Sequence, residues 1–204
     1  MPQPLDTLKE TPSQTAGPYL HIGLMPNFVG LHGTHVEDLG GRMINDQTKG
    51  ERITVEGRVI DGGGESLLDC VVEVWQADAA GLYPGPSGSR GTADPNFAGW
   101  GRAAADSQTG IFRFATIKPG QVPFPDGRLQ APHMNLWIVA RGINVGLNTR
   151  LYFGDEAGAN AADPILAGIE QQSRVKTLIA QRSGNIFTLD IHLQGPNETV
   201  FFDI

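Results

Sequence analysis

The chain has 204 residues, a length that suits one domain and that all-β domains often reach. Hydrophobic residues make up 40% and charged residues 18%, so the composition supports a folded core and excludes wholesale disorder. The formal net charge is −7 and no basic stripe is visible, which argues against nucleic acid as a partner.

The 27 glycines and 14 prolines indicate many turns and few long helices. The single cysteine, Cys70, lies inside an apolar stretch and has no partner for an internal disulfide, so we expect a small buried hydrophobe. Residues 1–10 lack a basic start followed by an apolar run, and the longest apolar run, near residues 136–140, is too short to span a bilayer. We therefore expect a soluble cytoplasmic protein with no membrane partner.

The first fifty residues do not predict regular core elements. Residues 1–20 are polar and hold four prolines, which is typical of an arm that lies on another surface. Residues 20–50 are irregular, with scattered Gly and His. We therefore divide the chain into an N-terminal arm and irregular segment at 1–50 and a β-sandwich domain at 51–204.

Short strands follow, separated by turn signals. The run at 52–60 is β-branched and ends at the turn sequence of residues 61–64, as a strand followed by a turn does. The other predicted strands are at residues 69–75, 111–116, 133–140, 149–153, 185–193 and 199–203. Two long Gly/Pro-rich loops, at 78–100 and 118–132, interrupt the series.

Residues 163–181 carry apolar side chains at helical spacing. Asp163 is a plausible N-cap with Pro164 at the first helical position, which predicts one or two short helical stretches. The whole pattern predicts an all-β fold, an antiparallel β-sandwich with long loops and one or two short helices. Sandwiches of this kind carry their chemistry in loops and at rims.

The residues by themselves point to little chemistry. There is no Gly-rich phosphate loop leading into a helix, no zinc-ligand spacing and no nucleophile elbow. His133 and Asn135 share one face of a predicted strand, where a His-x-His pair would offer two imidazoles to one metal. Asn135 breaks that pair, and a lone strand histidine is more often structural.

Six short motifs occur in order along most of the chain. They are TPSQTAGPY at 11–19, VEVWQADAAGLY at 72–83, GR at 101–102, TIKPG at 116–120, APH at 131–133 and TRLYF at 149–153. In this set and order the chain resembles the intradiol ring-cleaving dioxygenases. The stretches ARGIN at 140–144 and ETVFFD at 198–203 resemble one chain type, the α chain, of the two-chain members of that family.

The resemblance implies a non-haem Fe(III) site made of two tyrosinates and a His-x-His pair. The matching positions here are Tyr83, Val122, His133 and Asn135, so one phenolate and one imidazole remain. Gln130 stands where catalytic chains have a helper arginine. Because ferric ion prefers anionic oxygen donors, we expect vestigial metal positions, no bound metal and no catalytic residue in this chain.

The resemblance also implies a partner. In the two-chain members an α chain pairs with a β chain that holds the Fe(III), and αβ units assemble into a larger oligomer. The implied reaction is the cleavage of protocatechuate by O2 to 3-carboxy-cis,cis-muconate, a step of aromatic catabolism in the β-ketoadipate pathway. The segment 1–50 is then expected to pack on the partner, with Thr15, Gly17, Pro18 and Arg141 lining the substrate pocket.

Two other hypotheses stay open. The chain could be a purely structural assembly subunit that does not touch substrate. It could also be a free-standing catalyst that holds another metal through Tyr83, His133 and His192, although it has no second phenolate and no His-x-His pair. The position of the arm at 11–19, in a pocket or merely on a sheet, separates the first hypothesis from a substrate-lining role.

Overall fold

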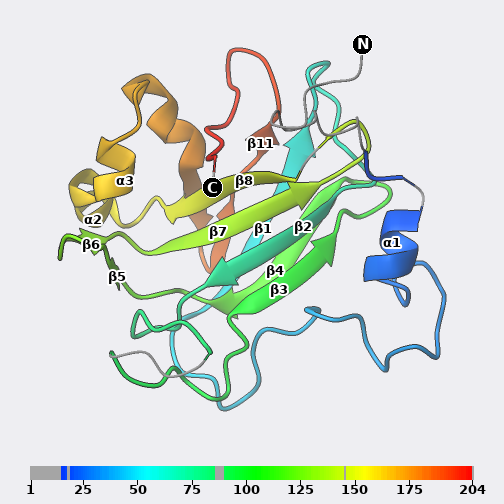
Figure 1. Ribbon diagram of the computed structural model, residues 1–204, viewed down its shortest axis with the longest axis horizontal. Helices are drawn as coiled ribbons and strands as arrows, with labels where there is room; N and C mark the ends of the chain where they lie inside the picture. Colours follow the sequence, from blue (N-terminus) through cyan, green and yellow to red (C-terminus); the bar gives the residue numbers. More distant parts are fainter. Residues whose placement is uncertain (1–14, 18, 86–89, 145, 204) are drawn as a thin grey trace, which may run out of the picture.

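The computed structural model describes residues 15–17, 19–85, 90–144 and 146–203. In these residues nine strands join one sheet in the order β11-β1-β10-β9-β8-β7-β2-β3, with β4 paired to β1 (Figure 1). The strands are β1 (Arg52–Ile60), β2 (Val71–Gln76), β3 (Trp100–Ala104), β4 (Ile111–Ile117), β7 (His133–Val139), β8 (Leu147–Phe153), β9 (Ile179–Ser183), β10 (Ile186–Thr188) and β11 (Ile191–His192).

The remaining elements lie in the connections. β5 (Val122–Pro123) and β6 (Leu129–Gln130) pair with each other in a small ribbon outside the large sheet. The helical elements are α1 (Tyr19–Leu24), α2 (Ala157–Ala162), α3 (Pro164–Ala167) and the 3-10 helix η1 (Gln172–Leu178). α1 lies at one end of the sheet, and α2 and α3 lie at the other end (Figure 1).

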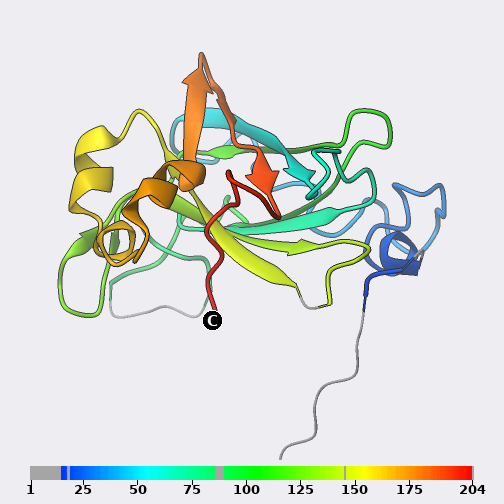
Figure 2. The same cartoon turned by 90° about the horizontal axis from the view of Figure 1, so that it is seen from above.

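The sheet folds over itself, so that β1 and β4 pack against β2, β7 and β8. The turned view in Figure 2 shows β1 and the β7–β8 hairpin in separate layers. Both layers contribute to one buried cluster, because alternate residues of each strand point inward. Members of the cluster include Val55, Val59, Val72, Val74, Phe112, Phe114, Met134, Leu136, Ile138, Leu151 and Phe153. The predicted all-β sandwich is thus confirmed.

The pairing is mixed, although the sequence predicted antiparallel strands throughout. β1 runs parallel to β10 and β11, and β8 runs parallel to β9. The predicted strand at 185–193 is interrupted where Leu189 and Asp190 leave the ladder. A Cβ on Gly57 would collide with the Leu189 carbonyl, so this glycine in β1 lets the neighbouring chain cross close by.

Three further differences concern elements that local pattern did not reveal. β3, α1 and α2 were not predicted, and β9 begins inside the stretch expected to be helical. The predicted strand at 199–203 is instead an extended segment held by one bridge between Asn148 and Phe202. The hydroxyl of Thr199 accepts a hydrogen bond from the His192 amide, which fixes the start of this segment.

Two local predictions are confirmed. The Asp163 side chain accepts hydrogen bonds from the amides of Ile165 and Leu166, with Pro164 at the start of α3, as an N-cap requires. Cys70 is fully buried, and burial raises the pKa of its thiol to about 12. In the described part of the chain no helix is long and apolar enough to cross a membrane. The division at residue 50 and the cytoplasmic location stay predictions.

Candidate functional site

Tyr83 is presented by a loop that Asp78 organises. The Asp78 carboxylate is almost fully buried and accepts hydrogen bonds from the amides of Ala80, Leu82 and Asp94. Three amide donors to one carboxylate hold a turn-rich segment in a single conformation, because each donor is otherwise unpaired. The loop is therefore rigid where it delivers Tyr83 to the sheet.

The Lys118-Pro-Gly120 loop places Val122 beside the same segment. Gly120 donates its amide to the Asp78 carbonyl at 2.9 Å, and a Cβ on Gly81 would collide with the Gln121 carbonyl. The two loops thus touch backbone to backbone, and this closeness requires glycine. The Lys118 ammonium pairs with Asp155 at 2.8 Å and Glu156 at 2.6 Å, which ties the loop to the segment after β8.

His133 begins β7 and is buried, with 2% of its surface exposed. Its Nδ1 donates to the Ala131 carbonyl at 2.7 Å, and its ring lies 5.7 Å from the Tyr152 ring between centroids. Burial, with a smaller contribution from the positive charge of Arg150, lowers the pKa of His133 to about 4. The imidazole is therefore neutral at pH 7, with the proton on Nδ1.

Asn135 occupies the second histidine position and is already engaged. Its side-chain nitrogen donates to the Tyr83 hydroxyl at 3.3 Å and to the Trp75 carbonyl at 3.3 Å. Burial raises the pKa of the Tyr83 phenol, so the hydroxyl keeps its proton. Tyr83 and Asn135 therefore form a neutral pair of hydrogen-bonding groups.

Val122 and Gln130 face each other across the β5–β6 ribbon. The Gln130 carbonyl oxygen accepts a hydrogen bond at 2.9 Å from Nη1 of Arg150, which lies in β8 opposite Asn135. Arg150 was not a predicted site residue, although it belongs to the TRLYF motif. The sequence predicts which face of β8 carries Arg150. It does not predict that Arg150 pairs with Asn135, because the register between two strands depends on non-local contacts.

The structure therefore joins all four vestigial positions through a chain of contacts, yet the donors do not fit a ferric ion. Val122 has no donor atom, and Asn135 points its N–H groups at Tyr83 and Trp75. In the described residues no group of three or more His, Cys, Asp or Glu is placed to hold a metal. His192 lies in β11, which four strands separate from β7 in the sheet order.

The predicted substrate-lining residues lie at the other end of β7. The Gly142 amide donates to the Thr15 hydroxyl at 2.8 Å, so Thr15 lies beside the residue that follows Arg141. The Arg141 guanidinium pairs with Asp69 at 3.2 Å, with 78% of the arginine side chain exposed. Gly17 is exposed, and a Cβ there would meet nothing within 4 Å. Pro18 lies outside the described residues.

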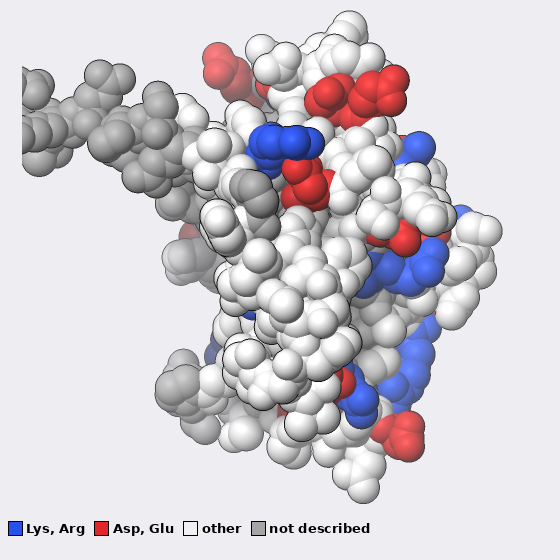
Figure 3. Space-filling view, turned by 90° about the vertical axis from the view of Figure 1, so that its right-hand side faces the viewer, with Lys and Arg blue, Asp and Glu red and all other residues white. Residues whose placement is uncertain are grey.

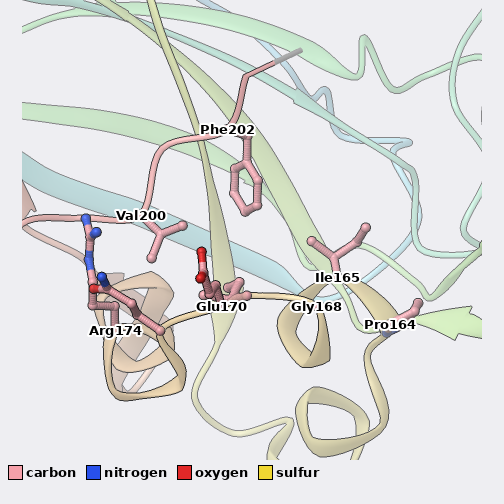
Figure 4. A pocket seen from close by; sticks show the side chains of 9 residues that line it. Pro164, Ile165, Gly168, Glu170, Arg174, Val200 and Phe202 are labelled. Atoms are coloured by element: carbon pink, nitrogen blue, oxygen red, sulfur yellow. The ribbon is translucent and has the colours of Figure 1, made fainter.

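One cavity lies apart from both groups of residues. It has a volume of about 440 Å³ between α3 and the C-terminal segment, where Val200 and Phe202 lie across from Ile165 and Gly168 (Figure 4). Arg174 lies at one side of this cavity and forms an ion pair with the Glu198 carboxylate at 2.8 Å. None of the predicted site residues lines this cavity.

A second groove, of about 360 Å³, adjoins the vestigial positions. Asn135 stands at its edge, and the three tryptophans of the chain, Trp75, Trp100 and Trp137, line it from neighbouring strands β2, β3 and β7. Trp75 is 44% exposed. The groove is thus aromatic and open to solvent, and Asn135 is the one vestigial position that lines it.

Comparisons with known proteins agree with this architecture. The sequence profile of the dioxygenase family matches residues 25–195. The protocatechuate 3,4-dioxygenase alpha chain of Pseudomonas putida is 44% identical over 204 residues, covering 98% of this chain and 99% of the relative. This chain belongs to the intradiol ring-cleaving dioxygenase family. The corresponding alpha chain of Burkholderia cepacia is 38% identical, covering 98% of this chain and 100% of that relative.

A beta chain of the same dioxygenase from Burkholderia cepacia is also similar, at 37% identity over 164 residues, 78% of this chain and 66% of the relative. Among solved structures, the dioxygenase domain of a dioxygenase carbohydrate-binding protein fusion from Streptomyces sp. SirexAA-E has a TM-score of 0.54 at 23% identity. That match covers 94% of this chain and 100% of the domain and supports the fold. Within the dioxygenase family, this chain is therefore an alpha-type subunit of an oxidoreductase.

Proposed function

We propose that this dioxygenase subunit works as the α chain of a protocatechuate 3,4-dioxygenase, in which a β subunit holds the Fe(III). The complex would cleave protocatechuate with O2 to 3-carboxy-cis,cis-muconate. The observation that carries the proposal is the donor set at the vestigial positions. With Val122 and Asn135 in place of a phenolate and an imidazole, this chain supplies pocket walls, charge and assembly, while the redox chemistry belongs to its partner.

A partner of this kind would cover the apolar segment that follows the arm. Seven of the ten exposed large hydrophobic side chains in the described residues lie between positions 19 and 39. They are Tyr19, Ile22, Phe28, Val29, Leu31, Val36 and Leu39. Figure 3 looks onto the α1 side of the molecule, where a wide area carries no charged side chain. Such a surface is typical of a protein interface, and it supports the proposal that residues 1–50 pack on the β subunit.

The substrate pocket is proposed to include Thr15, Gly17, Pro18 and Arg141 of this chain. In support, Thr15 and Arg141 come from distant parts of the sequence and lie at one exposed end of the sheet. Thr15, Gly17 and Arg141 line none of four cavities of about 360 to 440 Å³ in the described part of this chain. Under the proposal, the remaining walls of the substrate pocket come from the β subunit.

Arg141 has the chemistry to receive the carboxylate of protocatechuate. A guanidinium and a carboxylate form charge-assisted, often bidentate hydrogen bonds, which are stronger than neutral ones. The present partner, Asp69, holds Arg141 through Nε at 3.2 Å on an exposed surface, where an ion pair contributes little. A substrate carboxylate in a partly enclosed pocket would compete well for the remaining N–H groups.

The experiment that tests this function compares the chain alone with the chain co-expressed with its β subunit. We expect the chain alone to aggregate or to purify with poor thermal stability, and the complex to contain one iron per αβ pair. Metal analysis, size-exclusion chromatography and oxygen uptake with protocatechuate give the three readouts. A monodisperse, thermally robust monomer, or two irons per αβ pair, would contradict the proposal.

A second candidate is an assembly subunit that does not touch substrate. The pairing of Arg141 with Asp69 favours it, because an arginine already matched by a carboxylate is an ordinary surface residue. The two candidates differ in one respect. If the subunit is only structural, changes at Gly17 and Arg141 leave the KM for protocatechuate unaltered while the complex stays intact.

A further inference from the structure

Arg150 occupies the middle of the vestigial metal positions. It lies in β8 directly opposite Asn135 in the β7–β8 register, and its Nη1 donates to the Gln130 carbonyl oxygen at 2.9 Å. The same nitrogen donates to the Tyr152 hydroxyl at 3.2 Å. The guanidinium thus reaches toward the group opposite Val122 and toward the ring that packs on His133.

The surroundings of this guanidinium are those of a cation site. In the described residues no carboxylate oxygen lies within 4 Å of it, unlike Arg58, Arg102 and Arg182, each of which has an acidic partner. Its neighbours are instead neutral oxygens and the face of Phe202, whose ring centroid lies 5.9 Å from the guanidinium carbon. Neutral oxygen dipoles and an aromatic face stabilise positive charge without neutralising it.

The charge also acts on the groups that would otherwise ligate a metal. The guanidinium donates to Tyr152, whose ring lies 5.7 Å from the His133 ring between centroids. Arg150 also lies opposite Asn135, which donates to Tyr83, so its charge lies near both remaining donors. The nearest carboxylate in this hydrogen-bond chain, the buried Asp163, is reached only through the Tyr152 hydroxyl, which donates to it at 3.5 Å. A second cation placed among these donors would be repelled by the guanidinium, which has no direct carboxylate contact in the described residues.

We propose that Arg150 is the resident cation of the vacated iron site and that it keeps metal ions out independently of the two lost ligands. This goes beyond the proposed function, since it concerns the vestigial metal positions of this chain rather than the substrate pocket. It says that restoring Val122 to tyrosine and Asn135 to histidine is insufficient to restore a metal site while Arg150 keeps its charge.

The first experiment measures iron per purified complex and the absorption of a phenolate bound to iron. Three variants are compared with the unmodified complex: V122Y/N135H, V122Y/N135H/R150Q and V122Y/N135H/R113Q. Arg113 is the matched control, because it is an exposed arginine on β4 that pairs with Glu56. Activity is not needed as a readout, so an inactive second site is still detected.

We expect R150Q in this background to add about one equivalent of iron and new phenolate-to-iron absorption, since ligand number and charge then both suit a ferric ion. The V122Y/N135H and R113Q-containing complexes should keep the iron content of the unmodified complex. Iron uptake by V122Y/N135H with Arg150 present overturns the inference, and so does failure of a folded V122Y/N135H/R150Q complex to take up iron. Neither result alters the iron content of the unmodified complex, which tests the proposed function.

A second experiment does not depend on the multiple variants folding. R150A leaves an arginine-shaped vacancy, so the thermal stability of the complex is measured with methylguanidinium or with methylurea, which has a similar shape but no charge. We expect methylguanidinium to raise the melting temperature of R150A clearly more than methylurea does, and to have no such selective effect on R113A. Equal responses to the two compounds, or no response of R150A, would show that the position does not select a cation.

Discussion

At one end of β7, His133 and Asn135 donate hydrogen bonds to groups of the same chain and lie close to Arg150. Beyond the other end, Arg141 extends into solvent with 78% of its side chain exposed, beside Thr15. The first end has neutral, shielded donors. The second has a charged group whose only carboxylate partner in the described residues is itself 39% exposed.

The difference fits the proposed function, in which this chain holds no iron and contributes residues to a partner's substrate pocket. Buried polar groups need partners, and at the vestigial positions they find them within this chain: His133 donates to the Ala131 carbonyl and Asn135 donates to Tyr83. The groups at the far end have kept hydrogen-bonding capacity that this chain does not use. At one end of β7 the polar groups are hydrogen-bonded within this chain, and at the other end they remain available to another molecule. This arrangement is expected of a subunit that completes another chain's site.

The largest effect is expected from His133, at the buried end of β7, and it concerns the dependence of stability on pH. Its pKa is about 4 in the folded chain against 6.5 for an ordinary histidine, so the unfolded state takes up the proton first as pH falls. Stability from this group is fully present above pH 6.5 and is lost between pH 6.5 and 4, by up to about 3 kcal/mol.

His133→Gln removes that dependence, although it also costs some stability at pH 7. Urea unfolding of the complex at pH 7, 6 and 5 should give a shallower fall for this variant than for the unmodified protein or for His35→Gln, a change at an exposed histidine. The same pH slope in all three would mean that His133 is protonated as easily in the folded state as in the unfolded one.

Arg141→Ala tests the open end and has the next largest effect. Loss of a hydrogen bond to a charged group costs about 1.5–3 kcal/mol, so the KM for protocatechuate should rise roughly ten- to a hundredfold, and more than kcat falls. Steady-state kinetics of the assembled enzyme measure it. Arg128→Ala, an exposed arginine beside β6 that pairs with Asp126, is the control. A change under about threefold in Arg141→Ala would remove the assigned role.

Gly17→Ala should have a smaller effect that appears only in the assembly. A Cβ at Gly17 meets nothing in this chain, so the melting temperature should be nearly unchanged. In the assembly the added methyl group would clash with a substrate ring or partner backbone packed against residue 17, and the KM would rise severalfold. Gly158→Ala in α2 is matched, because a Cβ there also has open space and α2 lies outside the segment proposed to pack on the partner. Indistinguishable kinetics for the two variants would favour the structural role over the substrate-lining one.

The smallest effect is expected for Tyr83→Phe. Because Tyr83 is a neutral phenol that accepts a hydrogen bond from Asn135, its removal should cost about 1 kcal/mol of stability or less. Under the proposed function, any phenolate-to-iron absorption of the complex comes from tyrosinates of the partner, so it should be the same in this variant as in the unmodified complex. Loss of this absorption in Tyr83→Phe would mean that Tyr83 binds iron. The end of β7 near Tyr83 would then not consist of neutral groups bonded only within this chain.

Much of the fold was readable because its strands carry local signals. The run that forms β1 is β-branched, alternates and ends in a glycine turn, so its bounds were predicted correctly. β3 was missed because Trp-Gly-Arg-Ala-Ala neither alternates nor favours strands; it forms because β2 offers it an edge. α1 has six residues and no buried side chain, so no periodic pattern marked it.

The sequence showed which metal-ligand positions depart from the family pattern, but it did not show which other residues contact those positions. Val122 and Asn135 could be recognised in a family pattern because a motif fixes their spacing. Arg150 could not, since its importance depends on the register of β7 with β8 and on the Gln130 side chain brought in by a separate ribbon. Similarly, the Asp163 cap was predicted, but its bond to the Ala131 amide, which steadies the approach to His133, joins residues 32 apart in the chain.

The parallel pairing of β1 has a consequence for the order of events during synthesis. Arg58, in β1, binds Asp190 through two side-chain contacts although the residues are 132 apart in the chain. At about 5–20 residues per second a ribosome needs roughly 7–26 seconds to make the intervening chain. Throughout that time one edge of an apolar strand has no partner, which invites wrong pairing. The nascent chain therefore exposes this edge of β1 until its last strands emerge.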